Sequence, residues 1–362
     1  MRRTSADRST IAMMGSGSLA RATCYSLALL LRRPTRVVLC ARARDQLRDI
    51  AFVANAQARL AGSPAEFTHE WLNLEGDGLP GLLDRLQPQL VVNCSSYYSP
   101  WEHRYRPSLW TELLRSTAFG LTLPLQAPFA VKVAKALAER DRPPHFVNAC
   151  YPDAVNPLLA ALGLPIFCGA GNIAVLAAAC GAALAPADGQ SLQMLAHHLH
   201  LRAPGPPAEE ARLWLDGRPC TDVGGLLAAQ RAADGLEVNK LIGCTTAVLL
   251  RGILEKDRVE AHVPGPRGLP GGYPVRIERD TIDLDLPEGC SVEESVRWNE
   301  RAAEADGVTV STAGEVRFTM AAREALERHV PDLAGGFHAR DLDRATTRLL
   351  ALRERLRAQA VS

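Results

Sequence analysis

A short apolar run, TIAMM (10–14), leads directly into the glycine-containing segment GSGSLA and then into a stretch of helical composition. Gly15, Gly17 and Ala20 follow a G-x-G-x-x-A pattern. In such a turn the glycines permit a tight bend and a close approach to a diphosphate, while the small third residue lets the helix pack on the strand. The N–H groups at the helix N-terminus attract the anion. The pattern predicts a dinucleotide-binding turn with these contacts: Gly15, Gly17, Ser18, Leu19 and Ala20.

The segments that follow alternate between apolar runs and helical stretches. Apolar runs at 36–40, 89–96, 145–150 and 165–171 are typical of strands buried on both faces. This alternation predicts a parallel sheet covered by helices on both sides. After residue 172 hairpins and a Pro/Gly loop appear. We therefore predict an α/β fold, a doubly wound parallel Rossmann sheet over residues 1–160, followed by an α+β domain over residues 161–362.

Charge and composition narrow the range of partners. The chain has 41 Lys plus Arg and 40 Asp plus Glu, and its net charge of +1 gives no reason to expect a nucleic-acid or membrane partner. No window approaches the roughly 20 apolar residues of a membrane span. The nine cysteines lack metal-type spacing, and the N-terminal segment lacks the apolar run of a signal peptide. We expect a cytoplasmic protein with reduced thiols and no metal.

The second apolar run carries the signal for cofactor choice. In NAD-binding units an acidic residue about 20 positions after the glycines accepts hydrogen bonds from the ribose 2′-OH. Here Cys40 stands at that place, and Arg42 and Arg44 follow. Guanidinium groups bind a 2′-phosphate through paired hydrogen bonds. We predict NADP, with NAD as the alternative; the competing interpretation is that both arginines are solvated residues of a helix-capping loop.

The segment VVNCSSYYSPWEHRYRP (91–107) leaves a strand at the edge where ligands bind in open α/β sheets. Arg104 and Arg106 lie on its aromatic part, which suits a lid that brings positive charge over an anionic substrate. Solvated loop arginines are the competing interpretation. We expect the strand-end residues to contact the cofactor: Asn93, Cys94 and Ser95.

The segment SLQMLAHHLHLRA (191–203) contains the densest cluster of titratable side chains. Its alternation predicts a strand with His198 and His200 on one face and His197 on the other. An imidazole, with an ordinary pKa of about 6.5, suits proton transfer alongside hydride transfer. We expect His198 to be catalytic and His197 to be the second candidate, against the alternative of satisfied histidines. Lys240 is a further candidate acid or carboxylate binder, unless its side chain snorkels to solvent.

The order of these motifs resembles the lactate/malate dehydrogenase superfamily over roughly residues 9–300. The resemblance is carried by the glycine motif, the arginine-bearing loop, VNACYPDAVNP (147–157), CGAGN (168–172) and the histidine after them. It implies an NAD(P)-dependent dehydrogenase in which His198 donates and accepts the proton. Asn148 is similar to the strand-end asparagine beside the cofactor that orients the substrate oxygen. We also expect a homo-oligomer, specifically a homodimer.

Two positions depart from that family. Val175 and Ala178 stand where the family has an Asp that orients the histidine and an Arg that binds the substrate carboxylate. Without the Arg, a 2-keto acid loses a bidentate anchor. Without the Asp, another group must fix the tautomer of the histidine. Tyr151 and Asp153 are candidates for a partial replacement.

The sequence thus predicts an NADP-dependent oxidoreductase that transfers a hydride to or from a small anionic hydroxy/keto or amino/imino acid. One alternative is a redox-neutral enzyme that retains its nicotinamide, as an isomerase or lyase. The glycosidases that share this cofactor fold are one such class, and they bind a metal through a Cys and a His. Cys168 and His197 resemble those two ligands in placement. A second alternative is a dinucleotide-binding sensor without catalysis.

Overall fold

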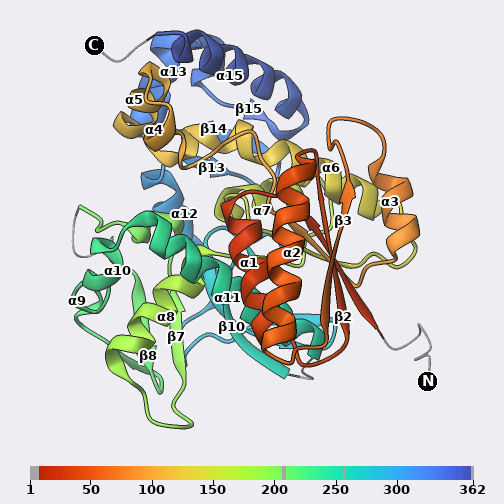
Figure 1. Ribbon diagram of the computed structural model, residues 1–362. Coiled ribbons are helices and arrows are strands. Elements are labelled where there is room, and N and C mark those ends of the chain that lie inside the picture. Colours follow the sequence, from red (N-terminus) through yellow and green to blue (C-terminus); the bar gives the residue numbers. More distant parts are fainter. Residues whose placement is uncertain (1–7, 206–208, 256–257, 360–362) are drawn as a thin grey trace.

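The computed structural model describes residues 8–205, 209–255 and 258–359 (Figure 1). Its central element is a six-stranded sheet in the order β3-β2-β1-β4-β5-β6, in which every neighbouring pair is parallel. This order is that of a Rossmann sheet, and the crossover between β1 and β4 opens a crevice at its carboxyl edge. The predicted fold class is confirmed. The strands are β1 Ser9–Met14, β2 Thr35–Ala41, β3 Ala65–Trp71, β4 Leu90–Asn93, β5 His145–Asn148 and β6 Cys168–Gly169.

Alternate strand residues face two separate cores. Ile11 and Met13 pack toward helices on one face, whereas Ala12 and Met14 pack toward the other. Because both faces are covered, the strands are continuous apolar runs. The first face is covered by α1 Ser18–Leu30, α2 Arg44–Leu60 and α11 Gly235–Glu255, and the second by α3 Leu79–Leu86, α6 Leu123–Ala138, α7 Pro152–Ala161 and α15 Leu342–Arg357 (Figure 1).

The later part of the chain adds three small antiparallel sheets, β7-β8-β9, β10-β11-β12 and β13-β14-β15. The hairpins expected after residue 172 are present, with β11 pairing antiparallel to β12 and β13 to β14. β6 belongs to the central sheet although it follows residue 160, and the division at that residue stays a prediction. The strands are β7 Leu192–Leu195, β8 Arg212–Leu215, β9 Arg218–Pro219, β10 Arg258–Pro264, β11 Gly272–Glu278, β12 Thr281–Leu284, β13 Val308–Val310, β14 Glu315–Phe318 and β15 Phe337–His338.

The remaining helices connect these sheets. In the described ranges, no helix is both long and apolar enough to cross a bilayer. The helices are α4 Glu102–Tyr105, α5 Leu109–Ser116, α8 Asn172–Leu184, α9 Val223–Leu226, α10 Ala228–Ala232, α12 Val292–Ala305, α13 Met320–His329 and α14 Pro331–Ala334, with 3-10 turns η2 Phe119–Thr122, η3 His198–Leu201, η5 Pro266–Gly268 and η6 Ala339–Asp341.

Two predicted elements differ from the structure. The strand expected over 191–203 ends at Leu195, and His198–Leu201 form a 3-10 turn. Reciprocal bonds stabilise this turn: the His197 ring accepts the Leu199 N–H at 3.3 Å, and the His200 ring accepts the His197 N–H at 2.8 Å. Side-chain caps of this kind compete with an extended ladder.

The composition of residues 109–141 predicts one long helix, kinked near Pro124 and Pro128, but this segment instead forms α5, η2 and α6. Pro124 lies in the first turn of α6. The backbone N–H groups there have no partner within the helix, so a proline costs the helix no hydrogen bond. Thr117 is extended and separates α5 from η2. The break matters because it brings Phe119 to the carboxyl edge of the sheet.

A glycine brings α11 close to α1, the helix that follows the glycine turn. A Cβ at Gly243 would lie only 2.4 Å from the Ala22 Cβ and 2.6 Å from the Ala22 carbonyl carbon. This contact requires a residue without a side chain. It places Val238, Asn239 and Ile242 of α11 along the cavity that opens beside α1.

Candidate functional site

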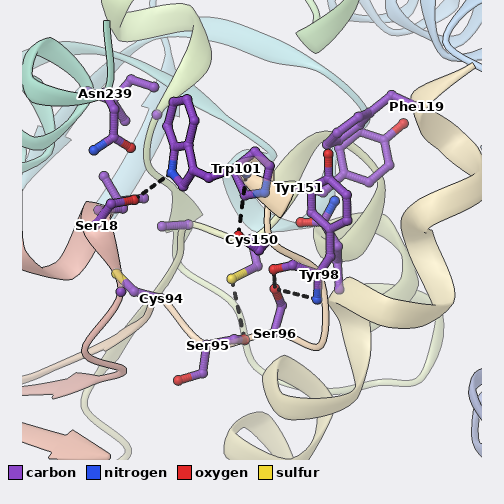
Figure 2. A pocket seen from close by; sticks show the side chains of 18 of the residues that line it. Ser18, Cys94, Ser95, Ser96, Tyr98, Trp101, Phe119, Cys150, Tyr151 and Asn239 are labelled. Carbon is purple, nitrogen blue, oxygen red and sulfur yellow. Dashed lines mark hydrogen bonds between the residues drawn. The ribbon is translucent and has the colours of Figure 1, made fainter. Parts of the chain in front are cut away.

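A cavity of about 1080 Å³ opens at the carboxyl edge of the sheet. It runs from the β1–α1 turn past the loop after β4 to the β5–α7 turn and η3. This is the switch point where dinucleotides bind in doubly wound sheets. In Figure 2, Ser18, Trp101 and Asn239 lie on one side with Cys94 below Ser18, the aromatic residues Tyr98, Phe119 and Tyr151 lie on the other, and Ser95, Ser96 and Cys150 lie between them.

The glycine turn has the geometry expected of a diphosphate cradle. Gly15 has φ +123°, and a Cβ there would lie 2.9 Å from the Cys94 carbonyl oxygen. Gly17 has φ −70°, and a Cβ there would meet no described atom within 4 Å. Within the described chain, no side chain caps α1, which leaves its N-terminus open to an anion. The cavity is lined by Gly15, Gly17, Ser18 and Leu19. Ala20 belongs to α1 and is buried.

The two arginines predicted to bind the 2′-phosphate both follow β2, but only Arg42 lines the cavity. Arg42 lines the cavity and pairs with Glu75, with 3.2 Å between Nη1 and Oε2. Arg44 lies outside the cavity, with its guanidinium 5.5 Å from the centre of the Trp71 ring. Cys40 is buried in the core, and burial raises the pKa of its thiol to about 12. The cavity is therefore lined here by Ala41, Arg42, Ala43 and Asn73.

The strand-end residues divide between the cavity and the core. Cys94 and Ser95 line the cavity. Asn93 and Asn148 are fully buried and lie outside its lining. The Asn93 amide donates to the Asn148 side-chain oxygen at 3.0 Å, and the Asn148 amide donates to Asn156 at 3.0 Å. These amides tie the ends of β4 and β5 to α7 below the cavity.

The loop after β4 is held at both ends. On one side the Trp101 indole N–H donates to the Ser18 hydroxyl at 2.8 Å (Figure 2). On the other side Arg357 of α15 makes paired bonds to Glu102 at 2.5 and 2.6 Å, and Arg353 donates to the Tyr97 carbonyl at 2.6 Å. Figure 1 shows α4 and α5 beside α13 and α15. The loop predicted as a lid thus bridges α1 and the C-terminal helix.

Three predicted cationic residues lie outside the cavity. Arg104 is paired with Asp234, with 2.5 Å between Nη2 and Oδ2, and Arg106 is exposed at the end of α4. Lys240 is exposed and pairs with Glu237, with 2.7 Å between Nζ and Oε1. Arg202, which the sequence analysis did not single out, does line the cavity.

Of the three clustered histidines, His198 reaches the cavity. His197 is buried beside it, with its Nδ1 3.8 Å from the Asp306 Oδ2. His200 stacks on Trp298 at 5.2 Å between ring centres, and burial lowers the pKa of its imidazole. The two neighbours therefore support the turn that presents His198.

His198 is oriented by a carboxylate from a distant part of the chain. Its Nδ1 lies 3.1 Å from the Oδ2 of Asp306, which also accepts the Tyr151 hydroxyl at 2.8 Å. The His198 backbone N–H donates to the Asp153 Oδ1 at 2.9 Å. The Phe119 ring stacks on the imidazole at 3.9 Å between centres. With Nδ1 directed at Asp306, the Nε2 atom is the nitrogen available for proton exchange.

The interaction between His198 and Asp306 shifts the pKa of both side chains. Burial acts to lower the pKa of His198, but the charge and hydrogen bond of Asp306 outweigh it and raise the pKa above 6.5. Burial acts to raise the pKa of Asp306, but His198 and the Tyr151 hydroxyl bring it below 3.8. Asp306 is thus a carboxylate at neutral pH, and His198 keeps its proton to a higher pH than a free imidazole.

Tyr151 holds an uncommon backbone conformation at this point. Its φ of +43° lies in the left-handed region, which non-glycine residues rarely adopt. The ring is buried, and its centre lies 5.5 Å from that of His198. Strained backbone of this kind clusters at functional sites.

The sequence carries no local signal for Asp306. This residue follows α12, 108 residues after His198, and the Asp-Gly pair at 306–307 is typical of a simple turn.

The two residues that resembled a metal pair, Cys168 and His197, are both buried. Cys168 is buried in β6, and burial raises the pKa of its thiol. Throughout 8–205, 209–255 and 258–359, no group of three or more His, Cys, Asp or Glu side chains could hold a metal ion.

The Gly17→Ala variant tests whether the cradle binds a diphosphate. Because the new methyl group meets no described atom, we expect an unchanged melting temperature. We expect it to weaken NADPH and NADH binding by about tenfold or more, since it occupies the space of the diphosphate. Isothermal titration calorimetry measures the affinity. Gly335→Ala, which also enters open space at an ordinary φ, should bind like the wild type; wild-type affinity in Gly17→Ala would contradict the prediction.

Comparison with known proteins supports the fold. No protein-family model and no curated protein matches the sequence. The crystal structure of lactate dehydrogenase from Eimeria maxima with NADH and oxamate is similar, with a TM-score of 0.52 and 15% identity over 84% of this chain and 93% of that chain. Malate dehydrogenases from Cryptosporidium parvum and Aeropyrum pernix each give a TM-score of 0.49 at 14% identity over 82% of this chain, covering 96% and 95% of their own. The chain therefore has a lactate/malate dehydrogenase-like Rossmann fold.

Proposed function

We propose that this protein is an NADP-dependent oxidoreductase that transfers a hydride to or from a small anionic hydroxy/keto or amino/imino acid. The observation that carries the proposal is that the His198–Asp306 pair and the glycine cradle line one continuous cavity. The similar lactate dehydrogenase structure was determined with NADH, a nicotinamide dinucleotide, and with oxamate, a small anion. Homodimer formation and a cytoplasmic location stay predictions.

The cavity residues fit a nicotinamide dinucleotide. Gly15, Gly17, Ser18 and Leu19 would hold the diphosphate, and Cys94 and Ser95 would contact the ribose beyond it. When bound, the dinucleotide would supply or accept the hydride. Among the described residues that line the cavity, Glu102 and Asp306 are the carboxylates, and neither lies at the end of β2. A lining without a carboxylate there favours NADP, with Arg42 as the 2′-phosphate ligand.

His198 performs the proton transfer in this proposal. During reduction of a keto acid, the Nε2–H proton moves to the carbonyl oxygen as hydride reaches the carbonyl carbon, giving a hydroxyl group. During oxidation, Nε2 takes the hydroxyl proton. Asp306 fixes the orientation of the ring and stabilises the imidazolium form, and Tyr151 holds the carboxylate in place. Asp306 thus does what the Asp absent at Val175 does in the resembling family.

The His198→Asn variant tests the proposal directly. We expect kcat for NADPH oxidation with a 2-oxo acid to fall about 100-fold or more, because the proton donor is lost. The NADPH affinity should change little, since the cradle is intact. His69→Asn replaces an exposed histidine on β3 and serves as the control. Equal turnover in His198→Asn and His69→Asn would refute the assignment, and activity in neither variant nor wild type would favour a binding protein without catalysis.

The Arg42→Ala variant tests the choice of cofactor. We expect it to weaken NADPH binding by about tenfold, since a charge-assisted contact to the 2′-phosphate is lost. NADH binding should be nearly unchanged. Paired calorimetric titrations of the two cofactors measure the effect, and Arg48→Ala on the exposed side of α2 is the control. An equal effect on both cofactors would remove the role assigned to Arg42.

The Asp306→Asn variant tests the coupled pair through pH. Wild-type reduction requires protonated His198, so kcat/KM should fall as pH rises through its raised pKa. Removing the carboxylate charge leaves burial to lower that pKa. We therefore expect the pH midpoint of kcat/KM to move down by about one unit or more. An unmoved midpoint would show that the observed ionisation belongs to another group.

A further inference from the structure

The cavity continues past His198 along an apolar wall. We call this wall, formed by Tyr98, Leu114, Ala118 and Phe119, the aromatic wall; all four residues line the cavity. The Tyr98 and Phe119 rings meet edge to face, with 5.6 Å between centres and 85° between planes (Figure 2). Phe119 also stacks on His198. A substrate with only a methyl group beside its carbonyl would leave this surface in contact with water, which is unfavourable.

One cation lies beside the same histidine. Arg202 follows η3, four residues after His198, and its exposed side chain lines the cavity. Across the described parts of the chain it has no carboxylate within 4.0 Å of its guanidinium nitrogens. The two other lining arginines are already paired: Arg42 with Glu75, and Arg115 with Glu112. Arg202 is thus the arginine of the described lining that has no carboxylate partner, whereas Arg42, which pairs with Glu75, is assigned to the 2′-phosphate.

The charge of Arg202 reaches both the histidine and the wall. Burial raises the pKa of Tyr98 to about 12, and the positive charge of Arg202 opposes this rise. For His198, burial and Arg202 act to lower the pKa while Asp306 raises it. A bound carboxylate would neutralise Arg202 and so favour the protonated imidazole that reduction needs. Anion binding at Arg202 would then be coupled to proton donation by His198.

We propose that Arg202 binds the substrate carboxylate and that the aromatic wall accepts an aryl-sized apolar substituent. The substrate class is then the 2-oxo and 2-hydroxy acids with an aryl side chain. Arg202 thus replaces the carboxylate-binding arginine for which Ala178 stands in this chain. It does so from the turn after His198 and not from α8. This inference rests on the proposed function and narrows it.

The test compares four substrates and four proteins. NADPH oxidation is followed at 340 nm with pyruvate, oxaloacetate, phenylpyruvate and the methyl ester of phenylpyruvate. For the wild type we expect kcat/KM to be about tenfold or more higher for phenylpyruvate than for pyruvate or oxaloacetate. In Arg202→Ala we expect KM for phenylpyruvate to rise about 10- to 100-fold, because a charge-assisted hydrogen bond is lost.

The uncharged ester isolates the role of the charge. Its KM should be nearly the same in wild type and Arg202→Ala, and Arg202→Lys should restore part of the phenylpyruvate affinity. Arg218→Ala, on the exposed β9 strand, is the control for a surface arginine. The inference is overturned if acid and ester lose equally in Arg202→Ala, or if the wild type prefers pyruvate or oxaloacetate.

A binding measurement separates this inference from the proposed function. Phenyllactate is titrated by calorimetry into protein saturated with NADP. Binding that is present in wild type and Arg218→Ala but lost in Arg202→Ala supports the aryl-acid site even if no substrate is turned over, a result that would remove only the oxidoreductase activity. Absence of phenyllactate binding to the wild type overturns the site, and reduction of a different 2-oxo acid would then leave the proposed function standing.

Discussion

The buried carboxylate of Asp306 is the interaction on which the geometry of the site depends. A charged group out of contact with water is costly unless hydrogen bonds and an opposite charge compensate it. Asp306 receives the Tyr151 hydroxyl from the β5–α7 turn and the His198 imidazole from η3. Three segments that are far apart in the sequence are therefore fixed to each other by a single side chain.

The backbone around Asp306 extends this arrangement to the substrate side of the cavity. Its carbonyl accepts the Gly120 N–H at 2.7 Å. A Cβ at Gly120 would lie 2.5 Å from the carbonyl carbon of Gly307, so η2 approaches the start of β13 without room for a side chain. This contact seats Phe119 against His198. The packing partner and the charge partner of the histidine are thus placed by the same stretch of chain.

What could be predicted from the sequence was what is encoded locally. The G-x-G-x-x-A turn and the apolar strands depend on residues within a few positions of one another. The strands and the position of the turn between β1 and α1 are confirmed, whereas dinucleotide binding by that turn stays a prediction. Alternation predicts a strand for the histidine run, but mutual capping by His197 and His200 makes it a turn. Asp306 could not be found, because its role exists only once α12 packs beside η3.

The cationic side chains illustrate the same limit. Arg104 and Lys240 have the charge that an anionic substrate needs, but each meets a carboxylate nearer to hand, Asp234 and Glu237 respectively. Arg202 has no sequence feature that distinguishes it from these two. Its availability depends on the absence of an acidic neighbour in three dimensions, which no local pattern records.

The loop after β4, held between Ser18 of α1 and Arg353 and Arg357 of α15, has a consequence for the dynamics of the molecule. Opening it outward breaks bonds to the last helix, so part of the cost of opening is the cost of loosening that helix. We therefore expect the two segments to open as one cooperative unit. Amide protons in the loop and in α15 would then exchange with solvent through a shared opening event. Shortening α15 would loosen the loop and so speed the entry of molecules into the cavity beside α1.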